Sequence, residues 1–310
     1  MNFGGTWTQI TSGVFVPGGN GQGMRLAVSK ANPNIVYVGE VADEGTILKS
    51  TNCGTSFTTA YHNAAQSLVG YDATTPGQGD YNFHMTCDPT NANIVYVAAH
   101  VVWKSTNGGT SWTQLTNWWA DCHTDMHGIN IHPVYNNMLF NVNDGGIFLS
   151  RDGGTSWTSR CDGIGASEIY HAAQSKLQRD IMSIGTQDNG ELYAQSAGWF
   201  TNRGGDWGSK CRFSYNSANT VYYYQNGNRR PVSGSETSYN LPFTASDNQC
   251  MDFNRKIPNV GFAALTDIFR SNNLNAGSPA WTQLGTIGKN IMDLHSSFAD
   301  SAVIYAFDDN

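Results

Sequence analysis

The chain repeats one short polar motif three times, and this repeat constrains its fold more than any other feature. The copies read STNCGTSF at 50–57, STNGGTSW at 105–112 and SRDGGTSW at 150–157. Asn or Asp followed by glycine tolerates a positive φ and closes a tight turn, while Ser and Thr hydrogen-bond to nearby backbone. An aromatic residue then starts the next strand, so each copy predicts a β-hairpin. A spacing of roughly 40 to 50 residues indicates an array of one supersecondary unit. The defining residues are Ser50, Asn52, Gly54, Phe57, Ser105, Asn107, Gly109, Trp112, Ser150, Asp152, Gly154 and Trp157.

A second pattern runs in phase with these repeat turns. Polar Asn or Pro turns are followed by β-branched and aromatic runs, and the outer aromatic recurs at Trp199 and Trp281, with room for a degenerate copy near Tyr239. Strands in such numbers predict an all-β fold, a seven-bladed β-propeller of four-stranded antiparallel blades. The seven runs lie at 33–38, 93–97, 137–140, 180–184, 219–223, 258–262 and 301–305.

The two ends of the chain complement each other in this pattern. Residues 5–10 read as an outermost strand without inner strands before it, whereas residues 290–310 supply inner strands without an outer one. We expect the N-terminal strand to complete the last blade and close the ring, which removes free sheet edges. Residues 1–310 then form a single propeller domain. Because the last blade lacks its third strand, we expect the chain to be a piece of a longer polypeptide.

Composition narrows the class of partner. Charged residues make up 13% of the chain, the net charge is −7, and the 17 basic residues are scattered. A nucleic-acid-binding protein would cluster its Lys and Arg, so such a partner is not expected. No apolar stretch approaches the length of a membrane span. Abundant Asn, Ser, Thr and aromatic residues with little Lys favour a bacterial protein that is secreted or on the cell surface.

Six cysteines occur without a Cys-x-x-Cys pair, which disfavours a structural zinc site. Cys122 and Cys161 fall in connections between blades, and Cys211 and Cys250 fall at the starts of consecutive inner strands. Each of these two pairs can lie close enough for a disulfide, and free thiols are the alternative.

Propeller topology assigns the chemistry to one face. The connections between blades and the loops from second to third strands open on one side, and the repeat turns lie on the other. We therefore interpret the repeat turns as scaffold. We call the opposite side the loop face, and it gathers carboxylates, imidazoles and aromatics. Its candidate ligand-binding residues are His127, Asp125, Trp118, Trp119, Tyr81, Asp206 and Trp207.

The repeat resembles the Asp-box, or bacterial neuraminidase repeat. Segments 127–133 (HGINIHP), 143–148 (NDGGIF) and 185–190 (GTQDNG) resemble those of sortilin-like and xyloglucanase-like propellers. The resemblance spans essentially the whole chain and implies the fold, but one propeller scaffold hosts many functions. Sialidases share only the scaffold, because their Phe/Tyr-Arg-Ile-Pro motif is absent: Arg25 lies between Met24 and Leu26.

The xyloglucanase-like resemblance implies catalytic acids in Asp-Gly-Gly segments after a second strand, where Asp144 stands. Glycoside hydrolysis needs two carboxyl groups. Asp188, in the corresponding turn of the next blade, is the candidate partner, with Asp125, Asp80 and Asp206 as further ones, and a segment outside these 310 residues is the remaining alternative. The family resembles a clamp of two propellers, and this chain has one. Both aspartates also suit turns that need left-handed backbone, so a purely structural role stays open.

Residues 123–127 carry a second possible chemistry. In an extended segment His123, Asp125 and His127 would point the same way and offer imidazole and carboxylate ligands to a transition metal. Structural hydrogen bonding is the alternative, and calcium on loop carboxylates is also open. Otherwise no cofactor is expected.

The sequence therefore predicts a secreted or cell-surface propeller that binds glycan or protein ligands on its loop face. It would be a monomeric propeller within a larger polypeptide, without membrane insertion. Aromatic rings beside polar loops are what carbohydrate grooves require. The alternative is a glycoside hydrolase that acts on a polysaccharide with an Asp pair on that face. A protein-binding propeller would instead present a broad face without an enclosed acid pair.

Overall fold

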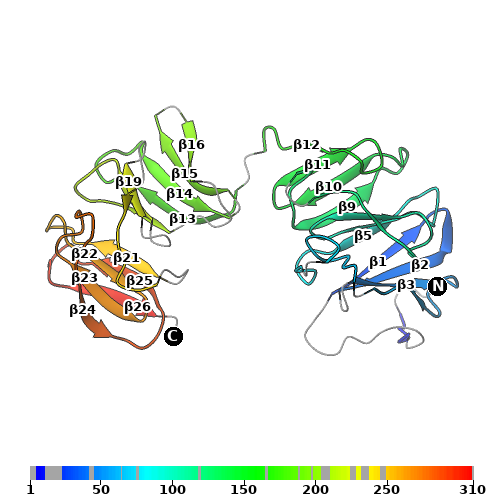
Figure 1. The fold of residues 1–310 in the computed structure, drawn as a ribbon, viewed down its shortest axis with the longest axis horizontal. Helices are drawn as coiled ribbons and strands as arrows, with labels where there is room; N and C mark the ends of the chain where they lie inside the picture. Colours follow the sequence, from blue (N-terminus) through cyan, green and yellow to red (C-terminus); the bar gives the residue numbers. More distant parts are fainter. Residues whose placement is uncertain are drawn as a thin grey trace. The chain divides into compact units, whose positions relative to one another are not determined.

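The elements with defined bounds in this computed structural model are all β-strands (Figure 1). Within the described part of the chain, no helix is long and apolar enough to cross a bilayer. The chain divides into two compact units, residues 1–165 and 166–310. The structure describes residues 5–10, 23–41, 45–63, 65–74, 77–117, 120–164, 167–187, 189–196, 198–203, 210–223, 228–231, 237–244 and 249–308.

The first unit consists of three antiparallel blades of four strands, each in sequence order. Tyr37, Ile47, Val95 and Val97 are fully buried between the first two blades. The strands are β1 (Met24–Ser29), β2 (Asn32–Glu40), β3 (Thr46–Ser50), β4 (Thr58–Tyr61), β5 (His84–Cys87), β6 (Val95–Ala98), β7 (Val102–Ser105), β8 (Thr113–Gln114), β9 (Met126–Ile131), β10 (Leu139–Asn143), β11 (Gly146–Ser150) and β12 (Thr158–Ser159).

The second unit continues the pattern with three four-stranded blades and one two-stranded sheet, β25–β26. Within the described residues six of the seven sheets are four-stranded, which confirms the prediction of an all-β chain built from four-stranded antiparallel blades. The strands of the second unit are β13 (Ile169–Gln174), β14 (Met182–Thr186), β15 (Gly190–Gln195), β16 (Gly198–Arg203), β17 (Cys211–Phe213), β18 (Thr220–Tyr223), β19 (Asn228–Pro231), β20 (Thr237–Ser238), β21 (Cys250–Phe253), β22 (Gly261–Ala264), β23 (Asp267–Ser271), β24 (Trp281–Thr286), β25 (Ile291–Ser296) and β26 (Ile304–Asp308).

The N-terminal segment differs from expectation. Residues 5–10 are not in a strand, and all of them are exposed, with Trp7 at 91%. A strand exists only when a neighbouring strand takes up its backbone hydrogen bonds, and a polar sequence pattern does not supply that neighbour. Ring closure by pairing of this segment with residues 290–310 stays a prediction.

The repeat turns share one hydrogen-bond pattern. In the third copy the Ser150 hydroxyl donates to Asp152 Oδ1 over 2.8 Å and accepts the Gly154 N–H over 2.9 Å. Asp152 also accepts the Ser156 N–H (2.9 Å) and hydroxyl (2.6 Å). The Trp157 indole N–H closes the motif on the Gly154 carbonyl over 3.1 Å. Each turn is thus held by side chains that replace missing sheet hydrogen bonds.

One position in the first copy carries backbone strain. Cys53 has a φ of 58°, where the later copies place Gly108 at 74° and Gly153 at 73°. Glycine adopts this left-handed region without cost, whereas a residue with a Cβ does not. The turn around Asn52 keeps its hydrogen bonds despite the substitution.

A fourth turn of the same kind was hidden from the sequence. The Ser271 hydroxyl donates to Asn273 Oδ1 over 3.1 Å, and Asn273 Oδ1 accepts the Ala280 N–H over 2.8 Å. The aromatic Trp281 follows ten positions after the serine instead of seven. Three extra residues break the spacing while the Ser–Asn contact survives.

The innermost strand of each blade is a sheet edge, and polar side chains contact some of its backbone N–H groups. His84 Nδ1 accepts the Ile129 N–H of the next blade over 3.2 Å. In the second unit Asp252 Oδ2 accepts the Ser296 N–H over 2.6 Å, and His171 Nδ1 lies 3.4 Å from the Cys211 nitrogen. Successive blades are therefore joined by side chain to backbone contacts along their inner strands.

All six cysteines are free thiols, so neither of the two possible disulfides forms. Cys122 is buried, whereas Cys161 accepts the Ile147 N–H through its sulfur over 3.3 Å. The Cys211 and Cys250 thiols point to backbone carbonyls of Ser183 and Ile291. Burial raises the pKa of the Cys211 and Cys250 thiols to about 12. Although Cys211 and Cys250 start consecutive inner strands, their sulfur atoms therefore do not meet.

The repeat turns make acid stability testable at Asp152. Hydrogen bonds from the Ser156 hydroxyl and backbone, and then from Ser150, lower the pKa of Asp152 to about 2. This carboxylate stabilises the fold above its unfolded pKa of about 4, and the contribution is lost as pH falls towards 2. The other two copies carry Asn here, and Asn52 Nδ2 donates to the Ser56 hydroxyl. We expect Asp152→Asn to fold normally and to lose less stability than wild type between pH 4 and 2.

Thermal unfolding between pH 2 and 7 measures this difference. The control is Asp180→Asn, because Asp180 is 77% exposed and lies 3.9 Å from Arg179. If both variants lost less stability than wild type between pH 4 and 2, and by the same amount, a specific role of the repeat turn would be contradicted.

Candidate functional site

The end of the β9–β12 blade that carries the β10–β11 loop positions two aspartates. Met126 of β9 pairs with Asn143 of β10, so Asp125, just before β9, and Asp144, just after β10, lie at the same end of adjacent strands. The Asn143 side chain accepts the Gly145 N–H over 3.0 Å and shapes the turn after Asp144. The repeat turn of this blade lies at its other end, after β11. The expected separation of scaffold and loop face therefore holds within the blade.

Asp144, His127 and Tyr81 form the accessible part of the site. His127 Nε2 lies 2.7 Å from Asp144 Oδ1, and the two side chains are 38% and 17% exposed. Tyr81 meets the His127 ring edge-on, with centroids 5.0 Å apart, and is 56% exposed. Because Nε2 faces a carboxylate, the neutral imidazole carries its proton there and leaves Nδ1 as an acceptor.

Asp125 lies deeper and binds other residues. Its Oδ1 accepts from Gln78 Nε2 (2.6 Å) and Asn82 Nδ2 (2.7 Å), and lies 3.2 Å from His100 Nδ1. Asp125 has a φ of 56°, so the segment around it is not extended. The alternation expected for His123, Asp125 and His127 is therefore broken.

His100 organises this deeper part. The residue is fully buried, and its Nε2 accepts the Gln78 N–H over 3.2 Å. The neutral ring must then hold its proton on Nδ1, which lies 2.9 Å from Thr124 Oγ1 and 3.2 Å from Asp125 Oδ1. Tyr71 stacks on the same ring with centroids 3.8 Å apart. Tyr71 is thus a packing residue, and His100 ties the 77–82 segment to the β6–β7 loop.

The environment of Asp125 keeps it ionised. Burial alone would raise its pKa, but hydrogen bonds from His100 and Gln78 outweigh burial and lower the pKa below its ordinary value. A general acid needs the opposite shift, towards a proton held at neutral pH. Asp125 therefore serves as a fixed acceptor that holds the loop.

Several predicted site residues cannot be placed. Trp118, Trp119, Asp188, Asp206 and Trp207 lie outside the described residues. Their roles stay predictions, including the pairing of Asp144 with Asp188. Among the described residues no group of three or more His, Cys, Asp or Glu could hold a metal ion. Calcium binding stays untested.

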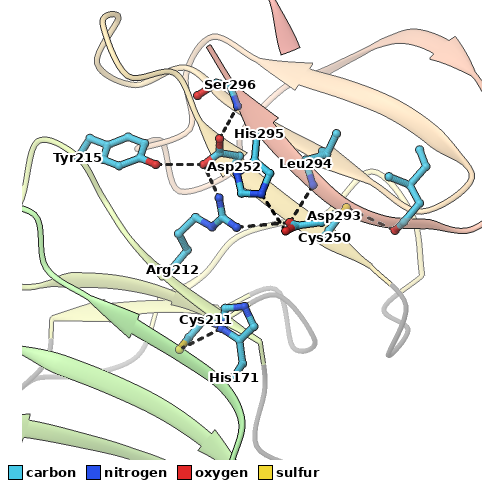
Figure 2. A network of polar contacts seen from close by, with 11 residues as sticks. His171, Cys211, Arg212, Tyr215, Cys250, Asp252, Asp293, Leu294, His295 and Ser296 are labelled. Carbon is cyan, nitrogen blue, oxygen red and sulfur yellow. Dashed lines mark hydrogen bonds and ion pairs between the residues drawn. The ribbon is translucent and has the colours of Figure 1, made fainter. Parts of the chain in front are cut away.

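Sequence reasoning missed a charged network on the inner strands of the second unit (Figure 2). Arg212 Nη1 lies 2.7 Å from Asp252 Oδ1, and Nη2 lies 3.4 Å from Asp293 Oδ1. His295 Nε2 lies 2.9 Å from Asp293 Oδ2. Burial, and then Arg212 and Lys210, lower the pKa of the neighbouring His171. Both aspartates follow a methionine near the middle of an inner strand, and this repeated pair was the available signal.

No family model and no curated protein match this chain. A family 74 glycoside hydrolase from Niastella koreensis is similar in structure, with a TM-score of 0.37, 16% identity, and coverage of 86% of this chain and 47% of that one. A family 74 xyloglucanase from Xanthomonas campestris gives 0.34 and 13%, covering 88% and 49%. YCF48 from Cyanidioschyzon merolae gives 0.33 and 13%, covering 90% and 91%.

This chain spans about half the length of the two family 74 enzymes. At these TM-scores the similarity carries nothing about activity. The function has to be inferred from the loop face itself.

The contrast between Asp125 and Asp144 is testable by stability. Asp125→Ala removes the acceptor of the fully buried Asn82 amide, and an orphaned buried donor costs about 1 to 3 kcal/mol. Asp144→Ala removes a partly exposed pair, which costs about 1 kcal/mol or less. Urea unfolding at pH 7 measures both losses. Equal losses would mean that Asp125 does not anchor the 77–82 segment.

Proposed function

We propose that this chain is an Asp-box β-propeller protein, secreted or on the cell surface, that binds glycan through Tyr81, His127 and Asp144. The observation that carries this proposal is an exposed aromatic ring beside an accessible histidine–carboxylate pair. Sugar sites combine an apolar ring surface with a few fixed polar groups. The hydrogen-bonded pattern of the three repeat turns supports the Asp-box interpretation.

The polar groups offer acceptors in a fixed arrangement. Among the described residues, Asp144 Oδ2 and His127 Nδ1 take part in no hydrogen bond, while Oδ1 and Nε2 bind each other. Neighbouring sugar hydroxyls are donors that fit two such acceptors. The Tyr81 ring can then cover the C–H groups of the same sugar. The Asp144 carboxylate repels anions, so we propose a neutral polysaccharide as the ligand.

Hydrolysis is the alternative, and the described residues favour binding over it. A glycosidase needs a second carboxyl that holds a proton. Asp125 has a lowered pKa and is bound by Gln78, Asn82 and His100. Asp80, Asp188 or Asp206 would have to supply the acid if the chain is a hydrolase. A protein ligand at the same face is a further outcome of the test below.

A glycan array on the purified chain tests the proposal, followed by titration calorimetry on the best neutral polysaccharide. We expect Tyr81→Ala and Asp144→Asn each to weaken binding about tenfold or more, or ~1.4 kcal/mol. The matched control is Tyr135→Ala. Tyr135 is 60% exposed and lies 5.0 Å from a histidine ring, but it is on the β9–β10 turn at the other end of the blade.

The outcomes separate the functions. Binding that is lost in Tyr81→Ala and kept in Tyr135→Ala supports the glycan site. Release of reducing ends by wild type, lost in Asp144→Asn, would favour the hydrolase instead. Absence of any glycan binding would overturn the proposal and leave a protein ligand as the alternative.

A further inference from the structure

A cavity of about 110 Å³ opens in the second unit, at the end where first strands turn into second strands. Its walls come from two neighbouring blades, through residues 214–216 after β17 and 253–260 at the end of β21. Leu274 and Asn275, after β23, complete the lining. A volume of this size accommodates several water molecules or a small polar group.

Arg255 lines this cavity without an acidic partner. Its Cζ lies 3.7 Å from the centroid of the Phe298 ring and 5.2 Å from that of Tyr215. Its Nε is buried and has no hydrogen-bond partner. No ion pair to Arg255 occurs among the described residues, whereas Arg212 in the same unit contacts two carboxylates. This Nε is therefore a buried donor that no described residue satisfies.

The other charges near the cavity add to this positive site. Lys256 also lines it, and its Nζ donates to the Ala299 carbonyl over 2.6 Å. The Tyr215 hydroxyl, beside Arg255, donates to Asp252 over 3.3 Å. Asp252 is 1% exposed and also contacts Arg212 and the Ser296 N–H. Asp252 is therefore engaged elsewhere and does not neutralise Arg255. The Asn216 amide provides a further polar group on the wall, whereas the Asn254 amide is bound to the Ser301 carbonyl and to the N–H groups of Lys256 and Ile257.

We propose that this cavity binds a carboxylate group of a small ligand, with Arg255 as its principal partner. The aromatic rings cover the guanidinium where they pack on it, which leaves its edge for the ligand. A planar carboxylate matches the donor fork of a guanidinium along that edge, and the pair is stronger where water is excluded. Either a uronic acid or an acidic amino acid carries this group. The cavity lies within the second unit, and this proposal does not depend on the function proposed for the first unit.

Titration calorimetry with glucuronate, N-acetylaspartate and glucose tests the proposal and shows which class of molecule supplies the carboxylate. We expect at least one of the two carboxylates to bind, and glucose to give no heat. Glucuronate alone would identify a sugar acid, N-acetylaspartate alone an acidic peptide group, and equal binding a general carboxylate site. Failure of both carboxylates to bind would overturn the proposal.

The variants assign the binding to Arg255. Arg255→Met keeps an apolar stem against Phe298 and should weaken carboxylate binding tenfold or more. Arg179→Met is the control, because Arg179 is 93% exposed on the same unit. If the methionine variant does not fold, Arg255→Lys retains the charge without the fork and should bind several-fold more weakly. Unchanged affinity in either Arg255 variant would overturn the assignment.

Discussion

Unpaired N–H groups on the innermost strand of each blade set the main constraint on this structure. An edge strand cannot leave such groups buried without an acceptor. At three junctions in the described part of the chain, a polar side chain from the preceding blade meets this need: His84 for Ile129, His171 for Cys211 and Asp252 for Ser296. Backbone chemistry thus explains the polar residues His84, His171 and Asp252 on inner strands. The same contacts order the strands that carry the loops of the candidate site.

Local patterns in the sequence predicted local structure well. The Ser–Asn and Ser–Asp turns form as expected because their hydrogen bonds lie within eight residues. The turn at Ser271 escaped prediction because an insertion changed the spacing to its aromatic, although the decisive Ser–Asn contact was preserved. Four-stranded blades followed from the same regularity. Residues 5–10 failed as a strand because pairing depends on a partner elsewhere in the chain.

The candidate site was only partly predictable, because it depends on side-chain geometry. The sequence singled out Asp144, His127 and Tyr81, but their mutual contact comes from the pairing of β9 with β10 and from the long segment before β5. Asp125 was grouped with them by alternation, yet its left-handed backbone turns it towards His100. No sequence pattern marked Arg255 as an arginine without an acidic partner among the described residues, because only its surroundings in the fold distinguish it from Arg212.

The two accessible thiols of the first unit lie at opposite ends of its blades. Cys53 is exposed in a repeat turn, and partly exposed Cys161 contacts the loop after Asp144, while Cys87 and Cys122 are buried. Burial raises the pKa of the latter two to about 12, which keeps them unreactive. The native chain thus carries one attachment point for a thiol-reactive dye at each end of the unit. A dye on Cys161 would sit near the proposed glycan site, and one on Cys53 would report from the scaffold side.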